Sequence, residues 1–169
     1  LAFWAERLAA EGIDAERDGD SLRFADPEGM GLELRAVETD DEPLDAVHPD
    51  IPAELALQGF DGVRAYSTEP EASRAFLEET LVFEPRGERA WEARGEERGS
   101  FYIYDEPPAE RGLSGAGTVH HVAWSSTMED HVAWQQHVAA AGYRPTPVID
   151  RFWFRSIYFR EPSGVLFEI

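Results

Sequence analysis

Apolar and polar positions alternate most clearly in residues 145–169, where two runs of β-branched and aromatic residues flank the turn sequence EPSG at 161–164. Proline followed two positions later by glycine favours a tight turn, so this stretch predicts a β-hairpin. A three-residue loop then places Tyr158 directly across from Glu168 on one face of the sheet. Arg151 has the opposite parity to Tyr158, so it reaches that face only through a bulge or a bend.

The same hairpin signature occurs near the N-terminus, where Pro27, Gly29 and Glu33 repeat the spacing of the C-terminal hairpin. The chain therefore contains an internal repeat. Helical spacing and turn signals predict further elements around the two hairpins. The expected helices lie at 1–12, 68–81 and 126–142, and the expected strands at 59–67, 82–95, 98–106 and 118–124, followed by the C-terminal pair.

These elements group into units that run strand, helix, then two or three strands. We expect half a unit at 1–35, an acidic linker at 36–56, a whole unit at 57–108, a connector at 109–117 and a whole unit at 118–169. The predicted fold class is α+β, with about two and a half βαβββ modules that form curved mixed sheets. Because the first unit lacks its opening strand, we expect the chain to be a fragment of a protein with more units upstream.

The charge balance narrows the range of partners. The chain of 169 residues carries 34 acidic and 15 basic side chains for a net charge of −19, and every basic residue other than histidine is arginine. Such a surface repels nucleic acid and acidic membranes. An acid-rich chain without lysine favours a protein from a salt-accumulating halophile, whereas a GC-rich genome alone would explain the missing lysine but not the charge.

Two absences affect the expected location. The sequence has no cysteine, which excludes disulfides, cysteine-bound zinc and iron–sulfur clusters and fits a reducing compartment. No uninterrupted apolar run is long enough to span a membrane. We therefore expect a cytoplasmic protein, and the sequence also allows a homo-oligomer.

Candidate metal ligands lie in the last unit. Glu168 occupies an apolar terminal strand, where a carboxylate either faces water at an edge or is paired or metal-bound. His120 and His121 are adjacent in the predicted strand 118–124, so only one of them can face a given site. One His, Glu168 and one further His would form the facial triad of non-haem Fe(II) oxygenases, although zinc, nickel or manganese would accept the same atoms. The other histidines, which we expect at the surface, are His48, His131 and His137.

Three segments carry a resemblance to a known family: IPAELALQGF at 51–60, GAGTVHHVAW at 115–124 and TPVIDRFWFRSIYFREPSGVLFEI at 146–169. With the repeated unit, they resemble the vicinal oxygen chelate superfamily, which includes glyoxalases, bleomycin-resistance proteins and extradiol dioxygenases. Within it, the chain is most similar to ring-cleaving dioxygenases that act on hydroquinones. The sequence departs from the family pattern at Val82, where a glycine usually closes the helix.

The resemblance implies a role for each candidate residue. His121 and Glu168 take the places of the strand histidine and the carboxylate that bind the metal. His120, Arg151 and Tyr158 match positions that line the substrate pocket, where they would move protons and stabilise developing negative charge. The remaining histidine ligand belongs to the family's first unit, which we expect upstream of Leu1.

The function that the resemblance implies is Fe(II)-dependent ring cleavage, with a small hydroquinone- or catechol-like aromatic and O₂ as substrates. Manganese, zinc or nickel are alternative metals. A glyoxalase-type isomerase with nickel or zinc would need a second catalytic carboxylate, for which Glu33 is the candidate. A bleomycin-resistance-like binding protein would instead have a cleft lined by Trp124, Trp153 and Phe154. The chain on its own could also be inactive because its site is incomplete.

Overall fold

The computed structural model describes residues 1–44, 47–110 and 112–169. Residues 45–46 of the predicted linker and residue 111 of the predicted connector lie outside the described residues. The chain forms two compact units, one of residues 1–61 with 115–118 and the other of residues 62–114 with 119–169. Among the described residues, no helix is long and apolar enough to cross a membrane.

The first unit contains helix α1 (Ala2–Ala10) and an antiparallel sheet of three strands, β1 (Ala15–Asp18), β2 (Ser21–Ala25) and β3 (Gly31–Arg35). Leu22 on β2 is its one fully buried apolar side chain among the described residues. A short 3₁₀ helix, η1 (Ala53–Leu55), follows, and Trp4 Nε1 donates a hydrogen bond to the Leu55 carbonyl at 2.9 Å. The segment predicted as a linker therefore contributes a contact to this unit.

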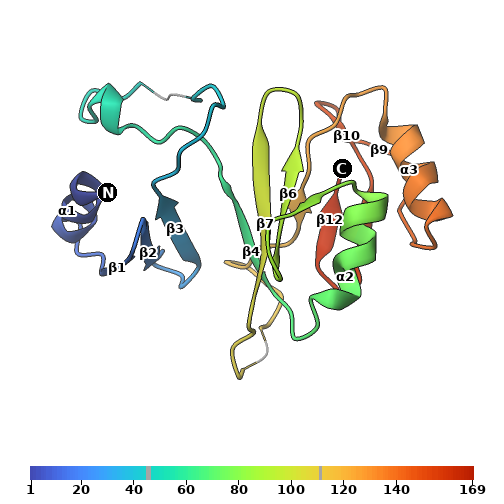
Figure 1. The fold of residues 1–169 in the computed structure, drawn as a ribbon, viewed down its shortest axis with the longest axis horizontal. Helices are drawn as coiled ribbons and strands as arrows, with labels where there is room; N and C mark the ends of the chain where they lie inside the picture. The colour runs from blue at the N-terminus through green and yellow to red at the C-terminus, as the bar shows by residue number, and fades with distance from the viewer. Residues whose placement is uncertain (45–46, 111) are drawn as a thin grey trace. The chain divides into compact units, whose positions relative to one another are not determined.

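The second unit contains two groups of elements (Figure 1), which correspond to the two predicted whole units and are called repeats below. The first has a mixed sheet in the order β4-β7-β6-β5. Its strands are β4 (Gly62–Tyr66), β5 (Glu84–Pro85), β6 (Ala90–Arg94) and β7 (Gly99–Asp105), and its helix α2 (Glu71–Ala75) continues as the π-helix η2 (Phe76–Thr80). The second has the sheet β11-β12-β8, a separate hairpin and a helix. Its elements are β8 (Val122–Ala123), α3 (His131–Ala140), β9 (Ile149–Asp150), β10 (Arg155–Ser156), β11 (Tyr158–Arg160) and β12 (Leu166–Glu168).

One hydrophobic core joins the two repeats of this unit. Phe76 from η2 makes ring contacts with Tyr143 and Phe159 of the second repeat, with centroids 4.1 and 5.8 Å apart. Tyr102 from β7 contacts Phe167 from β12 at 5.1 Å in an edge-to-face arrangement. Each repeat thus buries the apolar side of the other, and the α+β fold class is confirmed.

The first predicted helix of this unit is shorter and less regular than the sequence indicates. Of the expected 68–81, only Glu71–Ala75 is α-helical, and the next turn widens to a π-helix. Val82 then adopts φ = +58°, the left-handed conformation that usually requires glycine, and Phe83 N donates to Leu77 O at 2.8 Å to close the helix end. The helix therefore stops where the family pattern has its glycine, even though valine occupies the position.

Two predicted strands are also corrected. The expected strand 118–124 is reduced to Val122–Ala123, so the two histidines precede the strand. The run of aromatic residues in 149–160 does not form one strand. It folds into the β9–β10 hairpin, in which Arg151 N donates to Phe154 O at 2.8 Å, before β11 begins. In this turn Phe152 has φ = +73°, a left-handed conformation that glycine usually adopts. An aromatic residue at that position gives no sequence signal of a turn.

Candidate active site

The C-terminal hairpin forms with the register expected from its turn. Tyr158 pairs with Glu168, and Gly164 N donates to Glu161 O at 2.8 Å to close the loop. Gly164 has φ = +94°, which explains the requirement for glycine there. Because cross-strand partners stand on the same face, the phenol of Tyr158 and the carboxylate of Glu168 share one surface.

Each carboxylate oxygen of Glu168 has a partner in this cluster. Tyr158 OH donates to Oε1 at 2.6 Å, and Nε2 of His121 lies 2.6 Å from Oε2. Glu168 is 7% exposed, so it is a buried carboxylate and not an edge residue facing water. Partners on both oxygens meet the requirement that a buried carboxylate be hydrogen-bonded or paired.

The two adjacent histidines face each other. Nδ1 of His120 lies 2.9 Å from Nδ1 of His121, and the rings stand edge to face with centroids 5.2 Å apart. The expectation that only one of them can face the site assumed a regular strand. That expectation is wrong, because both precede β8 and the irregular backbone brings both rings to the same place.

Arg151 reaches the same cluster through the β9–β10 hairpin, which is the bend that the parity argument required. Its Nη2 donates to Tyr158 OH at 3.4 Å, and its guanidinium carbon lies 5.4 Å from the centre of the Tyr158 ring. The neighbouring acid Asp150 is the alternative ion-pair partner for Arg151. Its carboxylate accepts a hydrogen bond from Phe152 N at 2.8 Å. The structure therefore brings all five predicted site residues into one chain of contacts.

The other histidines have different surroundings. His48 is exposed, as expected. His137 is exposed as well, and its Nε2 lies 2.9 Å from the Thr80 carbonyl at the end of η2. The expectation of a surface position is wrong for His131, which is 5% exposed at the start of α3.

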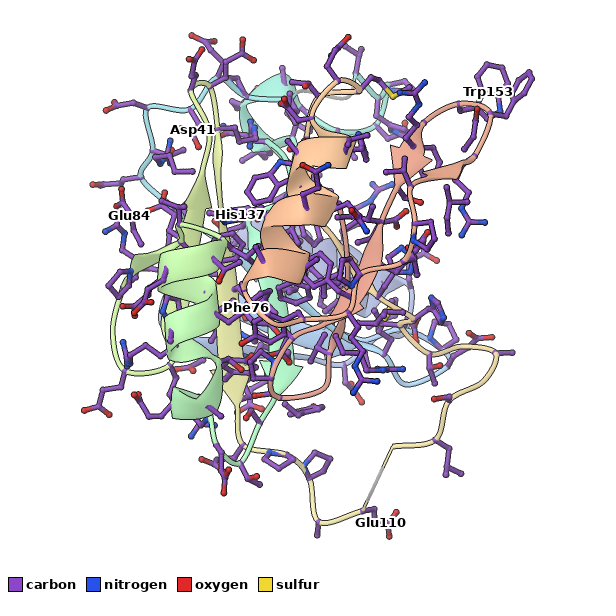
Figure 2. All side chains as sticks on the ribbon, turned by 90° about the vertical axis from the view of Figure 1, so that its right-hand side faces the viewer. Asp41, Phe76, Glu84, Glu110, His137 and Trp153 are labelled. Atoms are coloured by element: carbon purple, nitrogen blue, oxygen red, sulfur yellow. The ribbon has the colours of Figure 1, made fainter. Side chains whose placement is uncertain are left out.

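The three aromatic residues considered for a binding cleft do not share one environment. Trp124 packs in the core against Phe83 and Phe167, with ring centroids 4.7 and 5.5 Å away. Trp153 is 84% exposed and Phe154 is 48% exposed. Figure 2 shows Trp153 at the outer end of the β9–β10 hairpin, directed into solvent. The structure thus does not support a cleft made by these three side chains.

The donor atoms suit a transition metal in kind. An imidazole nitrogen and a carboxylate oxygen are ligands for Fe(II), manganese, zinc or nickel. Two ligand atoms about 2.1 Å from one ion are about 3.0 Å apart in an octahedral site and about 3.4 Å apart in a tetrahedral one. His121 Nε2 and Glu168 Oε2 would therefore separate only slightly to hold one. Within 1–44, 47–110 and 112–169, no group of three or more His, Cys, Asp or Glu side chains forms a metal site, so the described residues supply this pair alone.

Glu33 is the counterpart of Glu168 in the internal repeat, but its partners differ. Its cross-strand partner is Arg23, where Glu168 has Tyr158. Ser21 Oγ donates to Glu33 Oε1 at 2.5 Å, and Arg23 Nε lies 3.8 Å from the same oxygen. Glu33 thus has a hydroxyl donor and a half-exposed arginine nearby, where Glu168 has a phenol and an imidazole.

Known proteins of one superfamily are similar to this chain. The profile of the "Glyoxalase/Bleomycin resistance protein/Dioxygenase superfamily" matches residues 59–169. A Bacillus subtilis protein named "Putative ring-cleaving dioxygenase MhqO" is 35% identical over 178 aligned residues, which cover 100% of this chain and 56% of that protein. The chlorohydroquinone/hydroquinone 1,2-dioxygenase of Sphingobium indicum is 32% identical, covering 99% of this chain and 57% of its own length.

Solved structures agree with the fold. The crystal structure of a "putative dioxygenase" from Bacillus subtilis matches with a TM-score of 0.85 and 35% identity, covering 100% of this chain and 57% of that one. A glyoxylase/bleomycin resistance protein/dioxygenase domain from Frankia matches with a TM-score of 0.50 at 16% identity, over 67% of this chain and 96% of that chain. The chain spans less than three fifths of the length of either curated relative, from Bacillus or from Sphingobium.

Proposed function

The chain belongs to the glyoxalase/bleomycin resistance protein/dioxygenase superfamily, and on that premise we propose that it forms part of an Fe(II)-dependent ring-cleaving dioxygenase. Its substrates would be a hydroquinone- or catechol-like aromatic and O₂. Manganese, zinc and nickel are the alternative metals that the same ligand types accept. The proposal covers the whole protein's activity, to which these residues would contribute two metal ligands and three pocket residues.

The contact between His121 and Glu168 carries the proposal. An imidazole nitrogen and a buried carboxylate oxygen, far apart in sequence, lie 2.6 Å apart at the end of a curved sheet. Tyr158 orients the second carboxylate oxygen, and a partner of this kind typically strengthens a metal ligand by fixing its position. The relatives named as ring-cleaving dioxygenases support oxygenase chemistry for such a pair.

Bound iron would supply the redox chemistry between ring and oxygen, and the side chains of this chain would bind and orient the substrate and move protons. Tyr158 gives its hydrogen to Glu168, so its oxygen lone pairs face Arg151. A substrate hydroxyl near Tyr158 would therefore meet a proton carrier and a fixed positive charge together. That combination stabilises negative charge that develops on the ring oxygen.

His120 completes the proton path. When His121 uses Nε2 as a ligand, its hydrogen resides on Nδ1 and is donated to Nδ1 of His120, 2.9 Å away. His120 then carries its own hydrogen on Nε2, where it is available as a donor to the substrate. The exposed position of His120 fits this role, because a proton carrier needs a route to solvent.

The experiment is a Co²⁺ titration followed by visible absorption, with O₂ consumption measured on the Fe(II)-loaded protein. Both use the protein at the full length of its relatives, because the described residues supply only two of the three expected ligands. Hydroquinone and catechol serve as substrates. His121→Ala and Glu168→Gln are each expected to weaken Co²⁺ binding by at least about tenfold and to remove O₂ consumption. His48→Ala is the matched control, since His48 is exposed and lies outside the cluster.

Co²⁺ binding that survives both substitutions would disprove the metal site. Binding with no O₂ uptake by the longer, Fe(II)-loaded protein would disprove the oxygenase activity and leave the metal site standing. An isomerase of the glyoxalase type would instead require Glu33, and Glu33→Gln would then weaken metal binding. Glu33 has no histidine as its cross-strand partner, which is Arg23.

A further inference from the structure

Glu161 is the most deeply buried carboxylate of the unit that carries the site, at 2% exposure. It accepts four hydrogen bonds. Two come from backbone groups of its own turn, Ser163 N and Val165 N, each at 2.9 Å. Two come from the preceding repeat, Ser73 Oγ at 2.5 Å and Tyr104 OH at 2.7 Å. Four donors are sufficient to satisfy a buried carboxylate, so the group is fully paired.

The two backbone contacts fix the length of the loop. Oε2 accepts from Ser163 N and Oε1 accepts from Val165 N, so the carboxylate fits a turn with three residues between Glu161 and Val165. A shift of one residue in a β-hairpin turns every side chain of the strand to the opposite face. Glu168 is three residues beyond Val165, so the register that Glu161 selects decides which face Glu168 occupies.

The two hydroxyl contacts fix the turn in space. Ser73 on α2 is fully buried, and Tyr104 on β7 is 1% exposed, so neither donor can move without disturbing the core. Ser163 Oγ adds two contacts of 2.9 Å, to Ser73 Oγ and to Ser67 Oγ. The preceding repeat, at 62–105, therefore holds the turn through side chains of three different segments.

From this arrangement we propose that Glu161 is a positioning residue for the metal ligand Glu168, and that the preceding repeat serves as its template. That repeat has no histidine at the place where the last repeat has His121. Its contribution to the site is to position other residues. Ser73 and Tyr104 hold Glu161 by hydrogen bonds, and Glu161 sets the register of β12. That register places Glu168 next to His121. The proposal rests on the proposed metal role of Glu168.

The test uses Glu161→Gln in the protein at the full length of its relatives. Oε2 accepts three of the four hydrogen bonds and Oε1 accepts only that of Val165 N. An amide supplies one acceptor oxygen in place of two, so at least one of the four donors loses its partner. Amide hydrogen exchange is measured at the two positions beside Glu168: Ile169 N, which donates to Ile157 O, and Trp124 N, which donates to Glu168 O. We expect exchange there to accelerate by about tenfold or more relative to the amides of β6. Co²⁺ affinity should fall by a similar factor.

A matched control separates positioning from general stability. Val138→Ala removes a fully buried core side chain on α3 without touching the turn, and it should accelerate exchange in both sheets equally. The same uniform acceleration in Glu161→Gln, or an unchanged Co²⁺ affinity in that variant, would overturn the proposal. If Glu161→Gln does not fold, Tyr104→Phe removes a single donor and should produce a smaller acceleration that is still greater at the same two amides than at those of β6.

The two proposals fail separately. A protein at the full length of its relatives that carries no substitution and binds no Co²⁺ would refute the metal site and with it the role of Glu161 toward a ligand. An unsubstituted protein of that length that binds Co²⁺, together with a Glu161→Gln variant that binds it equally well, would refute the template role alone.

Discussion

Tyr158 and Glu168 face each other across β11 and β12, with the phenol hydrogen donated to Oε1 over 2.6 Å. The bond leaves Oε2 of Glu168 directed at His121. Without the phenol, Oε1 of Glu168 loses its hydrogen-bond donor, and the carboxylate is no longer held with Oε2 toward His121. We predict that Tyr158→Phe weakens Co²⁺ binding by about tenfold to a hundredfold, the usual effect of removing a group that orients a ligand.

Isothermal titration with Co²⁺ measures this change. Tyr66→Phe is the control, because Tyr66 on β4 is 60% exposed and lies in the other sheet. An affinity that does not differ between the two variants would show that the phenol has no influence on Glu168.

Val82 offers a stability test with a definite sign. Its φ of +58° places a β-branched residue in the left-handed region, which costs about 1–2 kcal/mol relative to glycine. The side chain is 72% exposed, so little packing is lost on its removal. We predict that Val82→Gly raises the free energy of unfolding by about 1 kcal/mol, measured by urea denaturation.

The same substitution elsewhere should have the opposite effect. Val132 lies in α3 with ordinary helical geometry and is 54% exposed. There glycine lowers helix propensity, so Val132→Gly should reduce the free energy of unfolding by about 0.5 kcal/mol. Two destabilised variants would mean that Val82 is not strained.

The parts of the fold that local chemistry determines were predictable from sequence. Residues 161–164 contain the proline and glycine that a three-residue loop needs, and the loop sets the pairing of Tyr158 with Glu168. The repeat of this signature around Glu33 revealed the second hairpin as well. In both places the pattern and the turn residues indicate the same structure.

The parts that depend on tertiary contacts were not predictable. The β9–β10 turn has Phe152 at a position that glycine normally occupies, so no turn residue marks it. The two histidines share one side because the strand begins only after them. The contacts of Glu161 with Ser73 and Tyr104 span 88 and 57 residues, and no local pattern predicts contacts over such separations.

Alkaline pH should destabilise the unit that carries the site. Burial is the main cause that raises the pKa of Tyr104 to about 12. Between pH 10 and 12 the unfolded chain then loses this proton while the folded chain keeps it. Stability that is complete below pH 10 is therefore lost as the pH rises, by up to about 1.4 kcal/mol per pH unit. Burial raises the pKa of Tyr102 as well, which adds to the effect.

Urea denaturation at several pH values tests this. Tyr104→Phe should flatten the decline between pH 10 and 12, although it also lowers stability at neutral pH because Glu161 loses a donor. Tyr66→Phe should leave the pH dependence unchanged. A decline that is equally steep in the Tyr104 variant would assign the alkaline sensitivity to other groups.

Salt should stabilise the protein. A net charge of −19 makes the folded chain repel itself, and raising the ionic strength from 0.1 to 1 M shortens the screening length from about 10 to about 3 Å. Exposed ion pairs such as that of Arg74 with Glu71 weaken too, but each contributes little. We predict a gain of about 2 kcal/mol, which raises Tm by about 4–8 °C. Calorimetry in KCl at neutral pH measures it, and the same series near the isoelectric point of about 4.5 should show almost no increase. A Tm that is insensitive to KCl at neutral pH would contradict the interpretation of the acidic surface as an adaptation to high salt.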